Sequence, residues 1–213
     1  MHYVPKMIYY KIYEASFQHY SYWLIRMSEI NIILVRHGEA SASWSEDLDP
    51  GLSKDGINQA KKLCEDESLK NLHNFKFISS PRKRAQETSS FLSSKLNKVL
   101  EINNVFDEIP AKGVLLEDKM DWLKSIASMP IKDLPISVQE WNEKIIDRLL
   151  SINQDSIIFT HFMVMNAVVA YAKQFSKLVN ISPDYTSTIK ITAKDSQIIS
   201  LKVGDQKKTK INI

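Results

Sequence analysis

Two residues that could bind and attack a phosphate group follow directly on an apolar run. Residues 30–35 read INIILV, and Arg36, His37 and Gly38 come next. An imidazole can attack a phosphorus atom, a guanidinium can bind phosphate oxygens, and a glycine lets the backbone approach an anion closely. Because ligands bind at the carboxyl ends of strands in open α/β sheets, this position suits a phosphorylated ligand.

Three further candidates stand close to other predicted elements. His161 follows a buried strand predicted over 156–160, and Arg84 lies near the start of the helix after a strand at 75–78. Glu108 comes a few residues after a short strand predicted at 99–102. All these positions fall at one edge of a parallel sheet, so two imidazoles, two guanidiniums and a carboxylate are expected to converge.

The apolar pattern predicts strands that alternate with helices. Ser53 is the expected N-cap of the first helix, and further helices are expected after 81, around 120–126, over 138–152 and from 162 to about 172. Two alternating runs at 186–193 and 196–203 predict a hairpin joined by Lys194 and Asp195. The expected fold is a three-layer α/β/α sandwich with a mainly parallel sheet, to which the hairpin adds an antiparallel edge.

Composition indicates an ordinary globular protein. The chain has 213 residues, 44% of them hydrophobic, and a net charge of +3, which gives no reason to expect a nucleic-acid or membrane partner. The single cysteine, Cys64, excludes an internal disulfide and favours a cytoplasmic setting. The composition neither favours nor excludes a homodimer.

The first 26 residues differ from the rest, since they hold six of the eight tyrosines. Lys6, Lys11 and Glu14 interrupt any apolar run, which argues against a signal peptide, and an interfacial anchor would need a cleaner polar face. We expect Met27 to be the natural start, with 1–26 an N-terminal extension and 27–213 the catalytic domain.

Several motifs, taken in order, resemble the histidine phosphatase superfamily, also called phosphoglycerate mutase-like, and in particular its small phosphatases. The matching stretches are residues 34–39, 49–56, 79–88, 106–109 and 159–161. The resemblance covers roughly residues 30 to 203. It implies a phosphoglycerate mutase-like fold and a phosphomonoesterase that acts on a small phosphorylated metabolite through phosphohistidine, with no metal and no cofactor.

The resemblance also gives each candidate a role. His37 matches the nucleophile, Glu108 matches the proton donor, and His161 matches the second catalytic histidine. A phosphate monoester is a dianion near neutral pH, so cations must offset its charge before a nucleophile can attack. The positions that match the phosphate pocket are Arg36, Ser43, Arg84 and His161.

Some positions leave alternatives open. Arg82 competes with Arg84, although the Arg-Ala-x-x-Thr pattern favours Arg84, and Asp107 competes with Glu108. Phe162 stands where most members have glycine, so its side chain must point away from the phosphate. Ser43 stands where asparagine is usual, and its hydroxyl can still donate to phosphate over a shorter reach.

Two rival functions are a phosphoglycerate mutase-type phosphotransferase and a catalytically silent protein that binds a phosphorylated ligand. The Glu-Arg-His-Tyr-Gly motif of the mutases is absent, because Glu108 is followed by Ile109 and Pro110. Specificity is expected to reside in residues 110–136, where Lys112, Lys119 and Trp122 could line the mouth of the site.

A protein that begins at Met27 is expected to fold and to keep its activity, because a terminus outside the core contributes little unless it docks. Melting temperature, oligomer size and turnover should be compared between the full-length and the shortened protein. A large fall in melting temperature, or dissociation of an oligomer, would instead show that the aromatic residues of the first 26 cover an apolar surface.

Overall fold

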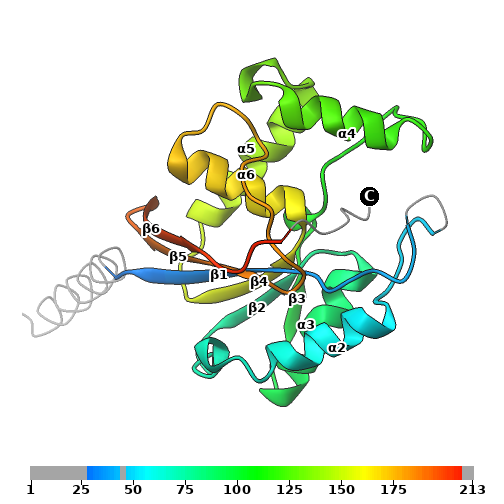
Figure 1. Ribbon diagram of the computed structural model, residues 1–213. Coiled ribbons are helices and arrows are strands. Elements are labelled where there is room, and N and C mark those ends of the chain that lie inside the picture. Colours follow the sequence, from blue (N-terminus) through cyan, green and yellow to red (C-terminus); the bar gives the residue numbers. More distant parts are fainter. Residues whose placement is uncertain (1–27, 44–46, 208–213) are drawn as a thin grey trace, which may run out of the picture.

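The computed structural model describes residues 28–43 and 47–207, so the expected extension over residues 1–26 lies outside the described part of the chain. Its centre is a six-stranded sheet in the order β3-β2-β4-β1-β5-β6 (Figure 1). The strands are β1 (Ile30–Arg36), β2 (Lys76–Ser79), β3 (Leu100–Ile102), β4 (Ser156–Thr160), β5 (Thr188–Lys194) and β6 (Gln197–Val203).

Helices cover both faces of this sheet (Figure 1). One hydrophobic core, here called the first core, lies between one face of the sheet and three helices. These helices are α4 (Lys119–Ser128), α5 (Ile136–Leu150) and α6 (Phe162–Lys173). A second hydrophobic core lies between the other face of the sheet and the helices α2 (Lys54–Leu63) and α3 (Lys83–Lys95). Alternate β1 residues separate accordingly, with Ile32 and Leu34 in the first core and Ile33 and Val35 in the second.

Parallel pairing links the four strands that carry or precede the candidate site residues. β1 pairs with β4, β4 with β2, and β2 with β3, all in parallel. β5 pairs with β1 and β6 with β5 in the antiparallel sense. The predicted three-layer sandwich with a mainly parallel sheet and an antiparallel hairpin edge is therefore confirmed.

The hairpin differs from its prediction by about two residues. Thr186, expected in the strand, has φ 57°, and the turn between β5 and β6 falls at Asp195 and Ser196, with φ 50° and 58°. Positive φ values at both central residues suit a tight hairpin turn, because that backbone twist matches the twist of the strands. The residues just before β5 are thus a loop, and this loop reaches the candidate site.

The start of α2 packs directly against the segment that follows β1. Ser53 caps the helix, since its hydroxyl accepts a hydrogen bond from Gly56 N at 2.9 Å, as predicted from the sequence. A Cβ atom on Gly38 would lie 2.8 Å from the Gly56 carbonyl oxygen, and one on Gly56 would lie 2.1 Å from the Glu39 carbonyl oxygen. Only glycine at both positions allows the two backbones to approach this closely.

Three short 3₁₀ helices complete the described fold, at Glu67–Leu69, Asn104–Phe106 and Ile131–Asp133. No helix among the described residues is long and apolar enough to cross a membrane.

Candidate active site

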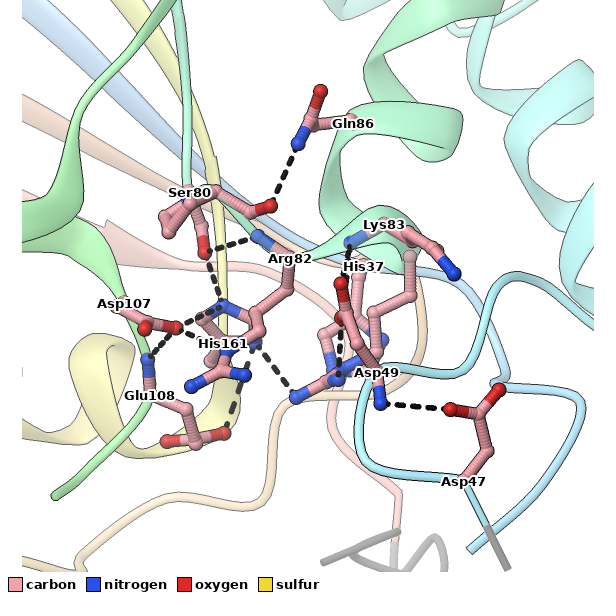
Figure 2. A network of polar contacts seen from close by, with 12 residues as sticks. His37, Asp47, Asp49, Ser80, Arg82, Lys83, Gln86, Asp107, Glu108 and His161 are labelled. Atoms are coloured by element: carbon pink, nitrogen blue, oxygen red, sulfur yellow. Dashed lines mark hydrogen bonds and ion pairs between the residues drawn. The ribbon is translucent and has the colours of Figure 1, made fainter. Parts of the chain in front are cut away.

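The two histidines that were expected to converge lie together at the carboxyl ends of the parallel strands. Arg36 is the register partner of Thr160, so His37 and His161 follow paired positions of β1 and β4. Their ring centroids are 5.3 Å apart. Arg84, on the first turn of α3, bridges them, with Nε 3.2 Å from His37 Nε2 and Nη2 3.5 Å from His161 Nδ1. Figure 2 shows this network.

The His37 ring is oriented with one nitrogen toward its own backbone. Nδ1 lies 2.7 Å from the Gly38 carbonyl oxygen, which can only accept, so Nδ1 carries the proton. Burial, reinforced by the charges of Arg84 and Arg36, lowers the pKa of His37 well below its usual value. The ring is therefore neutral near pH 7, and Nε2 presents a lone pair toward Arg84, as a nucleophile requires.

The segment after His37 is held by α3. The Gly38 N–H donates to Thr88 Oγ1 at 3.0 Å, and the same hydroxyl donates to the Arg84 carbonyl at 2.6 Å. Thr88 entered the sequence analysis only as the threonine of the Arg-Ala-x-x-Thr pattern. Its hydroxyl connects the two segments that supply His37 and Arg84.

His161 is fully buried and has a hydroxyl partner. Ser80 Oγ, at the end of β2, lies 2.6 Å from His161 Nε2. The other ring nitrogen, Nδ1, faces Arg84 and Glu108. Burial, with Arg84 and His37 as further causes, lowers the pKa of His161 well below its usual value. His161 can therefore donate a hydrogen bond to a phosphate oxygen without adding a charge.

Glu108 is carried by a short loop that the core fixes on both sides. Phe106 and Ile109 are buried in the first core. Trp141 Nε1 donates to the Asp107 carbonyl at 3.0 Å. These anchors hold the loop in place and leave Glu108 beside the histidines.

The Glu108 carboxyl group is buried, and its Oε2 lies 3.8 Å from His161 Nδ1. Burial raises the pKa of Glu108, and the charge of Arg84 opposes this rise. A carboxyl group that keeps its proton at higher pH can act as a general acid, because it can protonate a leaving oxygen. Its geometry thus suits the role that the resemblance implies.

The two competing positions occupy different surroundings. Arg84 is fully buried against both histidines, whereas the Arg82 side chain is 37% exposed and donates through Nε to Asp107 Oδ1 at 2.7 Å. Asp107 Oδ1 also accepts from Glu108 N at 2.7 Å. Arg82 and Asp107 therefore form an ion pair beside the site, and the geometry favours Arg84 and Glu108 for contact with the reacting group.

Arg36 is fixed by a carbonyl and by two aromatic rings. Its Nη1 donates to the Pro183 carbonyl at 2.7 Å. Its guanidinium carbon lies 4.4 Å from the Tyr185 ring centroid and 5.4 Å from that of Phe162. Phe162 is 4% exposed and belongs to the first core. The bulky residue at the usual glycine position thus packs inward and supports Arg36 by a cation–π contact.

Ser43 lies at the edge of the described residues, just before 44–46. It is half-buried, and its carbonyl accepts from Asp47 N at 3.0 Å. Its role in phosphate binding stays a prediction. Within residues 28–43 and 47–207, no three His, Cys, Asp or Glu side chains gather as ligands for a metal ion.

Sequence reasoning missed two residues that touch the site. Ser80 could have been found, because it is a polar residue at the carboxyl end of a strand, directly before Pro81. Tyr185 offered no such signal. It belongs to the loop before β5, and its ring centroid is 6.5 Å from that of His37.

Arg84→Ala is expected to lower kcat/KM for a phosphate ester by about 100- to 1,000-fold, because the guanidinium contacts charge in both the bound and the transition state. Binding of inorganic phosphate, measured by calorimetry, should weaken as well. The matched control is Arg82→Ala, which removes a partly exposed ion pair and should change kcat/KM by at most about fivefold. Similar losses in both variants would show that Arg84 is not the specific phosphate ligand.

Known proteins resemble this chain at two levels, sequence family and fold. The family model of the histidine phosphatase superfamily (branch 1) matches residues 32–206. No curated protein matches the chain. Among solved structures, the phosphoserine phosphatase of Entamoeba histolytica in complex with 3-phosphoglyceric acid has a TM-score of 0.65 at 17% identity, covering 84% of this chain and 98% of that one.

Two other solved structures share the fold. A mycobacterial glucosyl-3-phosphoglycerate phosphatase has a TM-score of 0.63 at 15% identity, with 84% of this chain and 100% of that chain covered. A phosphoglycerate mutase from Bacillus anthracis has a TM-score of 0.63 at 15% identity, with 84% and 94% covered. At such identities these structures establish the fold alone. The family model, however, covers most of the chain, which therefore belongs to the histidine phosphatase superfamily.

Proposed function

We propose that this chain is a metal-independent phosphomonoesterase that hydrolyses a small phosphorylated metabolite through a phosphohistidine on His37. The observation that carries the proposal is the neutral His37 ring, whose Nε2 faces Arg84 while Nδ1 is held by the Gly38 carbonyl. A cytoplasmic setting is part of the proposal and rests on the single cysteine of the sequence.

In the first half-reaction, His37 Nε2 attacks the phosphorus atom of the ester. The N–P bond forms as the ester P–O bond breaks, and the proton of Glu108 moves to the departing alkoxide. Arg36 and Arg84 stabilise the charge on the remaining phosphate oxygens, and His161 donates a hydrogen bond to one of them. Protonation is needed because an alkoxide is otherwise a poor leaving group.

In the second half-reaction, water takes the place of the alcohol. Glu108, now ionised, accepts a proton from the water as its oxygen attacks phosphorus. The N–P bond breaks, inorganic phosphate forms, and both the neutral imidazole and the protonated carboxyl group are restored. Two easier displacements thereby replace one direct attack of water on a dianion.

The comparisons support a phosphatase-type enzyme in general, without pointing to one substrate. The solved structures that share the fold are named as phosphatases and as a mutase. Hydrolysis is favoured here because the mutase motif is missing after Glu108. Transfer of phosphate between the hydroxyls of a phosphoglycerate, instead of to water, would point to the mutase alternative.

His37→Ala is expected to remove nearly all turnover of an aryl phosphate while leaving the melting temperature close to that of the native protein, because the covalent route is lost. Rapid acid-free quenching of the native protein with labelled substrate should trap phosphate on His37 as an acid-labile, base-stable adduct. Activity of the alanine variant close to that of the native protein would rule out the mechanism.

Glu108→Gln is expected to slow hydrolysis of alkyl phosphates by about 100- to 10,000-fold and that of aryl phosphates far less, because aryl oxides leave without protonation. In the native protein the rate on alkyl esters should fall as pH rises through the raised pKa of Glu108, since the acid loses its proton there.

The matched control is Glu143→Gln, which changes an exposed carboxylate on α5 and should alter neither rate. Equal losses on alkyl and aryl esters in the Glu108 variant would remove Glu108 from the role of the acid.

A further inference from the structure

The two ring nitrogens of His161 have different neighbours (Figure 2). Nε2 lies 2.6 Å from Ser80 Oγ and 3.8 Å from Asp107 Oδ1. Nδ1 lies 3.5 Å from Arg84 Nη2 and 3.8 Å from Glu108 Oε2. Since the lowered pKa of His161 leaves the ring neutral near pH 7, one of its nitrogens carries a proton and the other accepts. The neighbours decide which nitrogen does which.

The position of the Ser80 hydroxyl is fixed by the strand that carries His161. Ser79 is the register partner of Phe159, so the chain leaves β2 and β4 at the same edge of the sheet. The Ser80 N–H donates to the Phe159 carbonyl at 2.9 Å, and the Ser80 carbonyl accepts from Ser79 Oγ at 2.9 Å. The hydroxyl and the imidazole are therefore held against each other by the pairing of two strands.

The Ser80 hydroxyl donates to His161 and does not accept from it. Ser80 is fully buried, and its Oγ already accepts a hydrogen bond from the Arg82 N–H at 3.3 Å. Among residues 28–43 and 47–207, His161 Nε2 is the one acceptor within hydrogen-bond distance of this hydroxyl. A buried hydroxyl group that fails to donate destabilises the fold, so the O–H points at Nε2.

A proton on Nδ1 follows from this hydrogen bond. The Nδ1–H group then stands beside Arg84 Nη2, and both groups are donors, so the 3.5 Å between them is not a hydrogen bond. Two donors next to each other suit a single acceptor that lies between them. A phosphate oxygen is such an acceptor, because it carries negative charge and has several lone pairs.

Asp107 favours the opposite arrangement. Its Oδ1, 3.8 Å from Nε2, would stabilise a proton on that nitrogen. Nδ1 would then present a lone pair to the site, and it would accept at most a weak hydrogen bond from Arg84 at 3.5 Å. That lone pair would repel a phosphate oxygen. The Ser80 hydroxyl is closer to Nε2 than the carboxylate and therefore determines the outcome.

We propose that Ser80 is a positioning residue, whose hydroxyl donates to His161 Nε2 and thereby keeps a proton on Nδ1 for donation to the phosphate group. The inference rests on the proposed phosphomonoesterase function for the identity of the ligand. The tautomer of His161, however, can be measured without any turnover.

Nitrogen-15 NMR of the native protein tests the proposal, because the non-protonated nitrogen of a neutral imidazole resonates far downfield of the protonated one. The histidines are labelled, and the signals of His161 are identified by their loss in His161→Gln. At pH 7 we expect a protonated Nδ1 and a non-protonated Nε2. Inorganic phosphate, at concentrations that saturate binding in calorimetry, should shift the Nδ1 signal and leave the tautomer unchanged. A proton on Nε2, or an Nδ1 signal that bound phosphate does not move, would overturn the inference.

Ser80→Ala removes the donor and should move the proton of His161 toward Nε2, which faces Asp107. The kcat/KM for an aryl phosphate should fall by about 10- to 100-fold, as expected when one hydrogen bond to a charged group is lost. Ser80→Thr keeps a hydroxyl group and should retain the proton on Nδ1 and most of the activity. The spectrum of the native protein decides the question if either variant fails to fold.

The matched control is Ser89→Ala. Ser89 is also fully buried, but its hydroxyl donates to the Gln86 carbonyl at 2.7 Å within α3. This variant should keep the native tautomer and a kcat/KM within about threefold of the native value. If Ser80→Ala, like this control, changed only the melting temperature and left the tautomer of His161 as it is, Ser80 would have a structural role and the inference would be wrong.

The outcome separates this inference from the proposed function. Turnover of an aryl phosphate by a native protein that carries the proton on His161 Nε2 overturns the Ser80 inference alone. A Ser80-dependent proton on Nδ1 that responds to phosphate, with no turnover of any ester, overturns the phosphatase proposal and leaves Ser80 as a positioning residue of a phosphate-binding site.

Discussion

The register between β1 and β4 determines the geometry of the whole site. Because Arg36 pairs with Thr160 in parallel, the next residue of each strand is a histidine at the same edge of the sheet. Both strands carry apolar residues on both faces, so a shift of one residue would keep them buried but would move the two histidines apart along the strands. Thr160 Oγ1 also donates to the Phe106 carbonyl at 2.8 Å, which ties the loop before Glu108 to the same strand end.

The arginines and the histidines of the site respond differently to burial. The guanidiniums of Arg36 and Arg84 are buried, and burial lowers their pKa values from a starting point so high that they stay charged at neutral pH. Burial also lowers the pKa values of the two imidazoles beside them, and because a histidine starts from a much lower pKa, both rings become neutral. Folding thus produces fixed positive charge next to an uncharged imidazole, a combination that suits the proposed attack on a dianionic ester.

The sequence predicted the parts of the site that depend on strand ends and on local motifs. His37 and His161 follow apolar strands, and Ser53 caps the helix that was expected after it. The contacts that Ser80 and Tyr185 make with distant segments were not predicted. Tyr185 contacts Arg36 from the loop before β5, in which Thr186 has φ 57°, and a positive φ at a threonine leaves no pattern in the sequence.

The packing around Arg36 has a consequence for ligand affinity. A long arginine side chain normally loses rotational freedom when it closes on a ligand, at a cost of up to about 2 kcal/mol. Here the rings of Phe162 and Tyr185 and the Pro183 carbonyl already hold the guanidinium in place. The entropy is therefore lost when the chain folds, so in the proposed role of Arg36 as a phosphate ligand the hydrophobic interior at the start of α6 would contribute to anion affinity through preorganisation.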